Sequence, residues 1–310
     1  MPSANQEKPA GTVAVIGLGS MGLGMAQSLR RAGIDVVGCD INRAAVERFV
    51  AEGGRGAATP TEAARGVDAV ISVVVNATQT EAILFGPDGA LQTMPQGAVV
   101  ISSATMDPAS ARKLAERVEP TGRHYLDAPI SGGTARAAKG ELTVMASGSA
   151  ASFAKARHAL EAMAVKVYAL GDKPGTGAAF KIINQLLAGV HIAAACEAMT
   201  FAAKQGLDLA KVYQVITASA GNSWMFENRM PRVVEGDYTP TSTVEIFVKD
   251  LGIVQDLARA ERYPVPLAAA ALQMFLAASG AGMGRDDDCS LARIYAQLSS
   301  TKLPRGADSG

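Results

Sequence analysis

The sequence contains few of the residues that build metal centres and disulfide frameworks. Only three of its 310 residues are cysteines (Cys39, Cys196 and Cys289), and they lie far apart without any Cys-x-x-Cys pair. This spacing excludes a disulfide framework and the common zinc-ribbon patterns, and it favours a reduced, cytoplasmic setting. The three histidines are equally scattered, so we predict no metal site.

An excess of charge is also missing. The 29 basic residues balance 29 acidic ones, whereas proteins that bind nucleic acids or anionic membranes usually carry a basic excess or stripe. We therefore expect neither nucleic acid nor membrane among the partners. Hydrophobic residues make up 48% of the chain and charged residues 19%, which excludes intrinsic disorder and indicates a soluble globular protein.

Long hydrophobic runs are not evident either. Residues 1–11 are polar and lack the apolar core of a secretory signal. One uncharged run in the second half, residues 182–196, is interrupted by Asn184, Gln185 and His191. It is also shorter than the roughly 18 apolar residues that a membrane span needs, so we expect no segment that crosses a bilayer.

The pattern of the chain changes near residue 170. Before this point, short Val/Ile-rich runs alternate with amphipathic stretches, which is typical of a parallel sheet covered by helices. The predicted strands are residues 12–16, 35–40, 69–75, 98–102, 125–128, 143–146 and 165–169. The predicted helices among them are residues 21–31, 44–52, 78–85, 108–118 and 150–163.

After residue 171 only helical patterns remain. They cover residues 177–205, 209–218, 223–234, 243–262, 267–278 and 290–297. The Gly- and Pro-containing segment 171–175 is the natural boundary between the two halves. We therefore predict an α/β domain of residues 1–172 followed by an all-helical domain of residues 173–310.

A glycine-rich loop follows the first predicted strand and opens the first helix, with the sequence Gly17-Leu18-Gly19-Ser20-Met21-Gly22. Glycines in such a loop permit a tight turn, close approach of the backbone to a pyrophosphate, and close packing of helix on strand. The phosphates then lie at the helix N-terminus, where free N–H groups favour negative charge. A second strand ends at Asp40, 18 residues beyond Gly22, which is the context that a Rossmann dinucleotide-binding domain requires.

Asp40 indicates which dinucleotide binds. Its carboxylate is expected to accept hydrogen bonds from the adenosine ribose hydroxyls and to repel a 2′-phosphate, which favours NAD. Arg43 keeps NADP open as the alternative, because an arginine just past the acid can hold that phosphate.

Four segments together resemble the β-hydroxyacid dehydrogenase family, which includes 3-hydroxyisobutyrate dehydrogenase and tartronate semialdehyde reductase. They are the loop 17–22, Asp127-Ala128-Pro129-Ile130-Ser131-Gly132-Gly133, Gly175-x-Gly177-x-x-x-Lys181-x-x-Asn184, and Lys249-Asp250-Leu251. The segments span almost the whole chain in the family's order. The resemblance implies an NAD-dependent hydroxyacid dehydrogenase whose helical domain binds substrate and pairs with other copies, as a homodimer or homotetramer.

Lys181 is the predicted catalytic residue. On a helix, Lys181 and Asn184 are neighbours on one face, which Ala188 and His191 continue. A lysine inside an apolar helix is costly to bury in its charged form, which favours the neutral amine that acid–base work needs. By spacing alone, a lysine with its head in water is the commoner outcome. The resemblance makes Lys181 the general base for the hydroxyl proton and Asn184 a hydrogen-bonding partner of the substrate.

The resemblance assigns further residues to substrate and cofactor. Ser131, Gly132 and Gly133 are expected to hold the substrate's acid group, although an ordinary turn has the same composition. Thr105 matches the family threonine beside the nicotinamide. The usual pattern there is Ser-Thr, but this chain has Ala104-Thr105, so one hydroxyl is missing and Ser103 is a candidate to replace it.

Two more residues complete the predicted cofactor site. Lys249 is expected, by the resemblance, to reach the cofactor from the helical domain, although a Lys-Asp pair is by itself usually a solvated helix face. Asn76 follows a strand of the predicted sheet, where open α/β sheets bind their ligands.

Within the family, the resemblance is closest to members that act on a four-carbon sugar acid, and it rests on residues 74–79, His191 and residues 221–229. Hydrogen-bonded hydroxyls discriminate between substrates more strongly than one methyl group does. The polar groups expected near the site are Asn184, Gln185, His191, Asn222, Ser223, Asn228 and Arg229. We therefore expect a sugar acid that loses its C2 hydroxyl hydrogen to become a 2-oxo acid.

Three alternatives stay open. One is a sister dehydrogenase acting on 3-hydroxyisobutyrate, glycerate or the other stereoisomer of the sugar acid. Another is an imine reductase, against which Lys181 argues because that related family usually has another residue there. The last belongs to a different class, a non-catalytic dinucleotide-binding scaffold, whose members lose the lysine.

Overall fold

A computed structural model of the protein describes residues 11–304. The chain divides into two compact units, with the first ending at Lys181 and the second beginning at Ile182. The predicted domain boundary after residue 172 lies nearby, in the loop ahead of the long helix α8 (Thr176–Lys204) that passes from one unit into the other.

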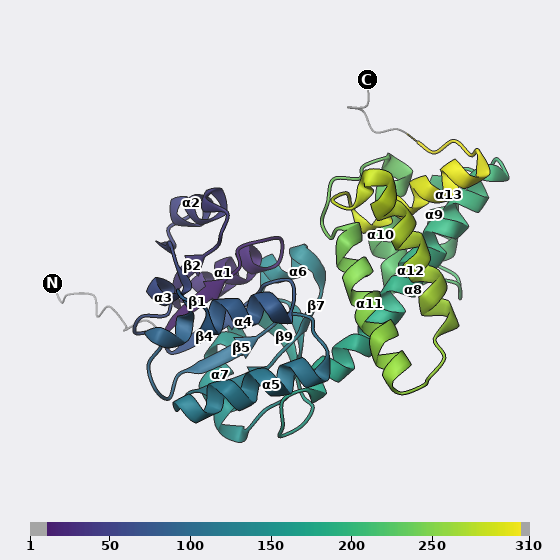
Figure 1. Ribbon diagram of the computed structural model, residues 1–310. Coiled ribbons are helices and arrows are strands. Elements are labelled where there is room, and N and C mark those ends of the chain that lie inside the picture. The colour runs from purple at the N-terminus through teal and green to yellow at the C-terminus, as the bar shows by residue number, and fades with distance from the viewer. Residues whose placement is uncertain (1–10, 305–310) are drawn as a thin grey trace. The chain divides into compact units, whose positions relative to one another are not determined.

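The first unit is built on a six-stranded sheet with the order β3-β2-β1-β4-β5-β6, in which every neighbouring pair is parallel (Figure 1). The strands are β1 (Thr12–Ile16), β2 (Asp35–Cys39), β3 (Arg55–Ala57), β4 (Ala69–Ser72), β5 (Val99–Ser102) and β6 (His124–Asp127). The chain builds outward from β1 to one side and then, from β4, to the other. This reversal makes the carboxyl ends of β1 and β4 the place where such sheets bind ligands.

Helices cover both faces of this sheet (Figure 1). Alternate residues of β1 divide between the faces, since Val13 and Val15 belong to one hydrophobic cluster and Ala14 and Ile16 to the other. The first cluster includes residues of α1 (Gly22–Arg31), α2 (Arg43–Ala51), α6 (Gly133–Lys139) and α7 (Ala150–Met163). The second includes residues of α3 (Pro60–Ala63), α4 (Ala77–Phe85) and α5 (Pro108–Val118), with the 3-10 turns η1 (Ala90–Gln92) and η2 (Glu119–Thr121) connecting them to strands.

A smaller sheet follows in the same unit. It has the order β7-β8-β9, with β7 (Ile130–Ser131) antiparallel to β8 (Leu142–Ala146) and β9 (Ala164–Ala169) parallel to it. Asp127, the last residue of β6, and Ser147, the residue after β8, exchange backbone hydrogen bonds of 3.1 and 2.8 Å. These bonds join the end of the large sheet to the small one.

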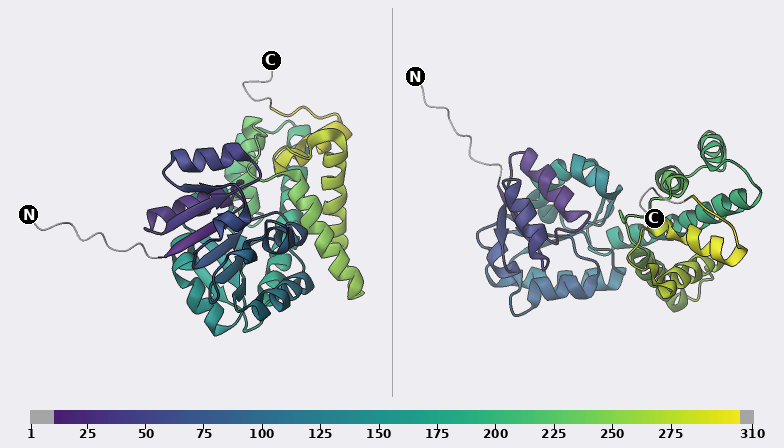
Figure 2. Two further views of the ribbon diagram at one scale, coloured as in Figure 1. Left: turned by 60° about the vertical axis from the view of Figure 1, so that its left-hand side comes forward. Right: turned by 90° about the horizontal axis from the view of Figure 1, so that it is seen from above.

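The second unit consists of helices and connecting loops, with a single β-bridge between Thr243 and Asp287 among its described residues (Figure 2). Its elements after α8 are α9 (Leu209–Thr217), α10 (Trp224–Glu235), α11 (Val244–Ala260), α12 (Pro266–Ala278), η3 (Ser279–Met283), η4 (Asp288–Ser290) and α13 (Leu291–Ser299). The core gathers α8 residues such as Ile192, Cys196 and Met199 with Phe247 and Phe275. The two phenylalanine rings stack with centroids 5.2 Å apart.

The predicted fold class is confirmed, namely a Rossmann sheet followed by helices. The sequence patterns missed β3, α3, β7 and α6, which have between two and seven residues and are too short to show a period. The predicted strand 69–75 was too long, because the backbone leaves the sheet after Ser72 and turns toward α4.

Two helical segments are long and apolar enough to cross a membrane by length and composition, residues 176–204 and 266–283. We set the first segment aside in the sequence because polar residues interrupt it, and did not consider the second, although residues 263–284 are uncharged. Length and composition alone are weak evidence for a membrane span. Of the most apolar window, 50% is buried inside the protein in the first segment and 28% in the second.

Candidate active site

The predicted residues of the first unit lie just beyond the carboxyl ends of its parallel strands. The loop 17–22 follows β1, Asp40 follows β2, Asn76 follows β4, Thr105 follows β5 and Ser131 follows β6. Because parallel strands end at the same edge of a sheet, the topology gathers residues that are far apart in the sequence.

The glycine loop has the shape that a pyrophosphate needs. A side chain on Gly17 would place its Cβ 2.5 Å from the carbonyl oxygen of Val73, and one on Gly22 would collide with the carbonyl of Gly17. These two glycines let the turn close against β4 and α1. A Cβ on Gly19, in contrast, would meet nothing within 4 Å. The backbone at Gly19 is thus open on the side where a dinucleotide phosphate would approach, and the loop fits the predicted cofactor.

Asp40 is tied to this loop. One of its carboxylate oxygens accepts a hydrogen bond from the N–H of Leu18 at 2.6 Å, and the other accepts from the N–H of Asn42 at 2.7 Å. Each carboxylate oxygen retains a second acceptor position. The structure therefore fixes the acid at the tip of β2 with acceptor capacity for ribose hydroxyls, while Asn42 caps α2.

The residues beyond β4 and β5 have mixed roles. Asn76 is the N-cap of α4, and its side-chain oxygen accepts from the N–H of Gln79 at 2.9 Å. Thr105 is half-buried and lies just before Asp107, the N-cap of α5. Ser103, the candidate to replace the missing family hydroxyl, has a buried hydroxyl without a hydrogen-bond partner among the described residues.

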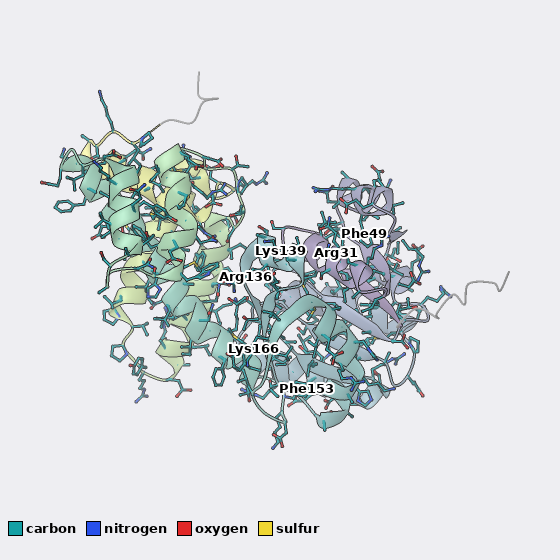
Figure 3. All side chains as sticks on the ribbon, turned by 180° about the vertical axis from the view of Figure 1, so that it is seen from behind. Arg31, Phe49, Arg136, Lys139, Phe153 and Lys166 are labelled. Carbon is teal, nitrogen blue, oxygen red and sulfur yellow. The ribbon has the colours of Figure 1, made fainter. Side chains whose placement is uncertain are left out.

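Ser131 ends β7, and Gly132 and Gly133 lead into α6 with φ angles of 142° and 75°, which side chains rarely adopt. Arg136 packs against this turn, since a Cβ on Gly132 would lie 3.1 Å from the Cβ of Arg136. Figure 3 labels Arg136 and Lys139, both on α6, and Arg31 donates to the carbonyl oxygen of Ala138 at the C-terminal end of that helix. Positive charge beside this turn favours the predicted binding of an acid group. The sequence patterns missed Arg136 because α6 was not predicted.

Asp127 is a second residue that the sequence patterns did not single out. It is 1% exposed, and one carboxylate oxygen accepts from the N–H groups of Gly175 at 2.9 Å and Ala178 at 2.8 Å. The hydroxyl of Ser147 donates to the same oxygen and accepts from the N–H of Gly177. Burial raises the pKa of Asp127, and these donors oppose that rise by stabilising the carboxylate. Asp127 and Ser147 together accept hydrogen bonds from N–H groups at the start of α8, which have no partner within the helix.

Lys181 lies one turn after this capped start of α8. Its side chain is 7% exposed, so it is not a lysine with its head in water. The preceding Gly177 lies so close to the carbonyl oxygen of Met145 that no side chain could be accommodated there. The glycines of the motif thus let α8 start directly on the strands, which fixes the position of Lys181.

The predicted residues of the second unit lie on several helices. Asn184 and His191 are half-buried residues of α8, and seven residues along a helix correspond to about 10 Å. Lys249 on α11 forms an ion pair with Asp250, with Nζ 2.7 Å from Oδ1. Ser223 is the N-cap of α10, accepting from the N–H of Phe226. Asn222 donates to the carbonyl of Thr217 and to Glu227, so both residues hold the α9–α10 loop.

Arg229 was expected near the substrate, but the structure places it in a buried ion pair. Its guanidinium donates to both carboxylate oxygens of Asp288, at 2.7 and 3.0 Å. Burial raises the pKa of Asp288 to about 6, and Arg229 opposes this rise. The neighbouring Asp287 accepts from the N–H and hydroxyl of Thr241. Asp287 and Asp288 are thus buried in the helical unit, and Asp287 also caps the 3-10 turn η4.

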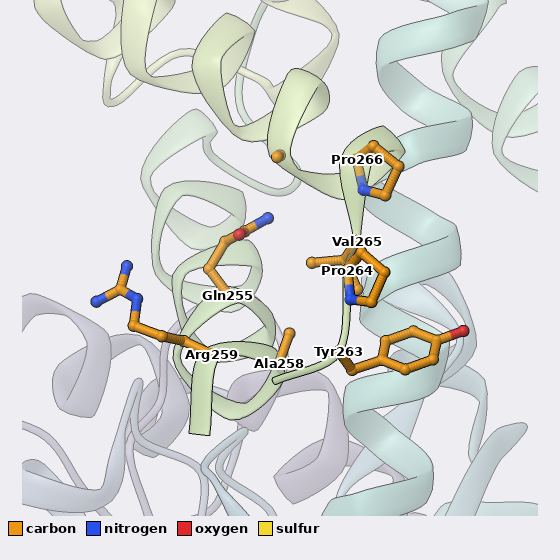
Figure 4. A pocket seen from close by; sticks show the side chains of 8 residues that line it. Gln255, Ala258, Arg259, Tyr263, Pro264, Val265 and Pro266 are labelled. Carbon is orange, nitrogen blue, oxygen red and sulfur yellow. The ribbon is translucent and has the colours of Figure 1, made fainter. Parts of the chain in front are cut away.

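A cavity of about 320 Å³ lies between the end of α11 and the start of α12 in the helical unit (Figure 4). Its lining includes Gln255, Arg259, Tyr263 and Pro264. None of the predicted site residues lines it, so it does not belong to the candidate site. In the part of the chain that the structure describes, no three His, Cys, Asp or Glu side chains are grouped to hold a metal ion.

Comparison with known proteins identifies the family. Residues 12–171 match the model of the NAD-binding domain of 6-phosphogluconate dehydrogenase, and residues 175–295 match the NAD-binding domain of NADP-dependent 3-hydroxyisobutyrate dehydrogenase. L-threonate dehydrogenase of Cupriavidus necator is 54% identical, with 91% of this chain and 95% of that protein covered. The chain belongs to the 3-hydroxyisobutyrate dehydrogenase-like family. It is therefore a hydroxyacid dehydrogenase, as predicted.

Other members of this family are similar over the same length. L-threonate dehydrogenase of Haemophilus influenzae is 49% identical, with 94% of this chain and 97% of that protein covered. A crystal structure described as 3-hydroxyisobutyrate dehydrogenase from Salmonella typhimurium has a TM-score of 0.88 and 51% identity, and it covers 91% of this chain and 99% of that one. An imine reductase from a Pseudomonas species, 21% identical with a TM-score of 0.60, shares the fold alone.

Proposed function

We propose that the protein oxidises the C2 hydroxyl of L-threonate to the corresponding 2-oxo acid, 2-oxo-tetronate, with NAD as hydride acceptor. The observation that carries this proposal is a set of five curated relatives, all named L-threonate dehydrogenase, at 48–54% identity over at least 91% of the chain. Relatives named for other acids are more distant, such as the mouse 3-hydroxyisobutyrate dehydrogenase at 31% identity.

The loop 17–22 would hold the cofactor pyrophosphate at the open backbone of Gly19, and Asp40 would bind the adenosine ribose. A carboxylate in this place accepts hydrogen bonds from ribose hydroxyls and repels a 2′-phosphate, which favours NAD over NADP. Asn76, Thr105 and Lys249 complete the proposed cofactor site. When bound, NAD supplies the acceptor for the hydride that leaves the substrate's C2.

Lys181 supplies the proton chemistry. Oxidation of an alcohol removes a hydride from carbon and a proton from oxygen, and the neutral amine of Lys181 takes that proton as the C=O bond forms. Burial of Lys181 favours this role because the neutral amine is easier to desolvate than the ammonium. In the reverse direction the ammonium returns the proton, so the same residue serves as general acid.

The substrate is held by its acid group and its hydroxyls. Ser131, Gly132 and Gly133 would bind the carboxylate, with Arg136 adding positive charge beside them. Asn184, His191, Asn222 and Ser223 are the proposed partners of the hydroxyls. A site lined by such groups rejects an acid that carries a methyl in place of a hydroxyl, because its polar groups would be left unpaired.

We also propose a cytoplasmic homo-oligomer, either dimer or tetramer, that interacts with neither nucleic acid nor membrane. Ile183, Leu187 and Phe201 are exposed on one long stripe of α8, where an apolar surface favours contact with another copy. Cys39, Cys196 and Cys289 are free and buried, which is compatible with a reducing compartment. Light scattering of the purified protein would measure the mass, and a monomer would contradict the oligomer.

A substrate panel tests the proposed reaction. The purified protein is assayed with L-threonate, D-threonate, glycerate and 3-hydroxyisobutyrate, each with NAD and with NADP. We expect L-threonate with NAD to give the highest kcat/KM. Faster turnover of 3-hydroxyisobutyrate, with no reduction of NAD by L-threonate, would overturn the proposed substrate. Equal use of NADP would overturn the role of Asp40.

A further inference from the structure

A chain of polar side chains connects α8 to α11 inside the helical unit. The side-chain amide of Asn184 donates to the carbonyl oxygen of Gln185 at 2.9 Å, and the amide of Gln185 donates to Oδ2 of Asp250. The other oxygen of Asp250 lies 2.7 Å from Nζ of Lys249. Gln185 is 6% exposed and Asp250 is 1% exposed, so the middle of this chain is shielded from water.

The packing of the two helices holds these groups together. Gly189 lies one turn after Gln185 on α8, and a Cβ at Gly189 would lie 2.9 Å from the side chain of Leu251. Leu251 follows Asp250 directly on α11. The missing side chain at Gly189 thus lets α11 approach α8 closely, and this approach brings Asp250 to Gln185.

The chain has a fixed direction. A carboxylate only accepts hydrogen bonds, so Gln185 must turn its NH2 group toward Asp250. Its carbonyl oxygen is then directed to Asn184, which must also present its NH2 group. The carbonyl oxygen of Asn184 consequently faces away from Gln185. An amide whose partners can both donate and accept could adopt either orientation. Here Asp250 determines the orientation of both side-chain amides, that of Gln185 directly and that of Asn184 through Gln185.

We propose that Gln185 and Asp250 are positioning residues that hold the amide of Asn184 with its oxygen as an acceptor for a substrate hydroxyl. This inference rests on the proposed function, since it assigns a role within that same site. Asn184 lies one turn beyond Lys181 on α8. An oxygen held in this way selects for hydroxylated acids, because an acid with a methyl or hydrogen at that place leaves the oxygen without a donor.

The test compares two substrates in one variant. Gln185→Met keeps the side-chain length but removes the hydrogen bonds to Asn184 and Asp250. The amide of Asn184 is then free to rotate, so that its oxygen and nitrogen can exchange places. We expect kcat/KM for L-threonate to fall by about 10- to 100-fold, mainly through KM, while kcat/KM for an analogue that lacks the contacted hydroxyl changes less than threefold. The 3-deoxy and 4-deoxy analogues of L-threonate identify which hydroxyl donates to the oxygen of Asn184. Gln273→Met, on the exposed part of α12, is the matched control and should leave both substrates unchanged.

A second variant keeps the inference testable if Gln185→Met folds poorly. Asp250→Asn can donate as well as accept, so it removes the fixed direction while preserving the shape of the side chain. We expect the same loss of preference for L-threonate over its deoxy analogue. NADH binding, followed by fluorescence, shows separately whether Lys249 is disturbed, and Gln185→Met should leave it unchanged.

The outcomes separate this inference from the proposed function. If both variants lose activity equally on L-threonate and on every deoxy analogue, Gln185 and Asp250 are merely structural and the inference is wrong. If the wild type prefers another hydroxy acid, the proposed substrate is wrong. For glycerate or D-threonate, which carry a second hydroxyl, the ratio between that acid and its own deoxy analogue then still decides the role of Gln185. A preference for 3-hydroxyisobutyrate, whose one hydroxyl is the group oxidised, would overturn the inference as well.

Discussion

In the α/β unit Asp40 and Asp127 accept hydrogen bonds mostly from the backbone, whereas Asp250 and Asp288 of the helical unit accept from side chains. Asp40 accepts from the N–H groups of Leu18 and Asn42, and Asp127 accepts from the start of α8. Asp250 and Asp288 accept instead from Gln185 and Arg229. Backbone donors come from strand ends and helix starts, so the fold itself supplies them, while side-chain donors depend on one particular partner.

This difference has a consequence for mutation. A carboxylate held by N–H groups keeps its donors whichever single side chain is replaced nearby. A carboxylate held by one side chain becomes a buried, unpaired charge when that side chain is removed, which typically costs several kcal/mol. The helical unit should therefore be more sensitive to single substitutions of polar residues than the α/β unit.

The largest expected effect is on catalysis, at the helix that begins in one unit and continues in the other. Lys181→Ala removes the proposed base, so kcat should fall about 10³-fold. NADH binding should change little, because the glycine loop and Asp40 are intact. Lys173→Ala, at an exposed lysine just before α8, is the control and should retain wild-type kcat. Persistence of turnover in Lys181→Ala would show that another group accepts the proton.

The next largest expected effect is on stability, at the buried ion pair between Arg229 and Asp288. Arg229→Met leaves Asp288 buried without its partner, and we expect the free energy of unfolding to fall by about 3–5 kcal/mol. Denaturant titration measures this change. Arg259→Met removes an arginine from an exposed pair with Asp256, and it should have a far smaller effect. Equal losses in the two variants would contradict the distinction between buried and exposed pairs.

A smaller loss is expected at the cap of α8. Asp127→Ala removes the acceptor for the N–H groups of Gly175 and Ala178, at a cost of about 2–3 kcal/mol. Asp127→Asn retains an acceptor oxygen and loses only the charge, so about 1 kcal/mol is expected. Thermal unfolding of the two variants gives the ranking. An alanine variant as stable as the asparagine variant would mean that the cap contributes little.

The smallest effect concerns pH. The folded pKa of Asp288 is about 6, above its ordinary value of 3.8, so the native state binds an additional proton between these two values. The contribution of Asp288 to stability therefore grows as pH falls through this window and is lost as pH rises above 6. Urea titrations of wild type and Asp288→Asn from pH 4 to 7 should differ in slope. Parallel curves would show that Asp288 does not titrate there.

The same comparison explains how far the sequence could be interpreted. The strand–loop–helix at Gly17–Gly22 and the acid at Asp40 are local patterns, and the structure places both at the expected edge of the sheet. The position of Lys181 also follows from a local motif, because Gly175 and Gly177 make the start of α8 recognisable.

The side-chain partnerships of the helical unit had no such signal. Gln185 and Asp250 are 65 residues apart, and Arg229 and Asp288 are 59 residues apart. Their contact depends on how the helices pack, which periodicity does not specify. For this reason Arg229 was expected near the substrate, whereas the structure places it in a buried ion pair with Asp288. Arg136 was not predicted for a different reason, because the short helix α6 has too few residues to show a helical period.

The most direct test of the proposed reaction follows the hydrogen that leaves the substrate. L-threonate deuterated at C2 is incubated with NAD and the purified protein, and the reduced cofactor and the product are analysed by mass spectrometry. Oxidation at C2 predicts that the deuterium appears in the reduced cofactor and that the product is the 2-oxo acid without deuterium. Transfer of deuterium only from C3-labelled L-threonate, or no reduction of NAD at all, would contradict the account.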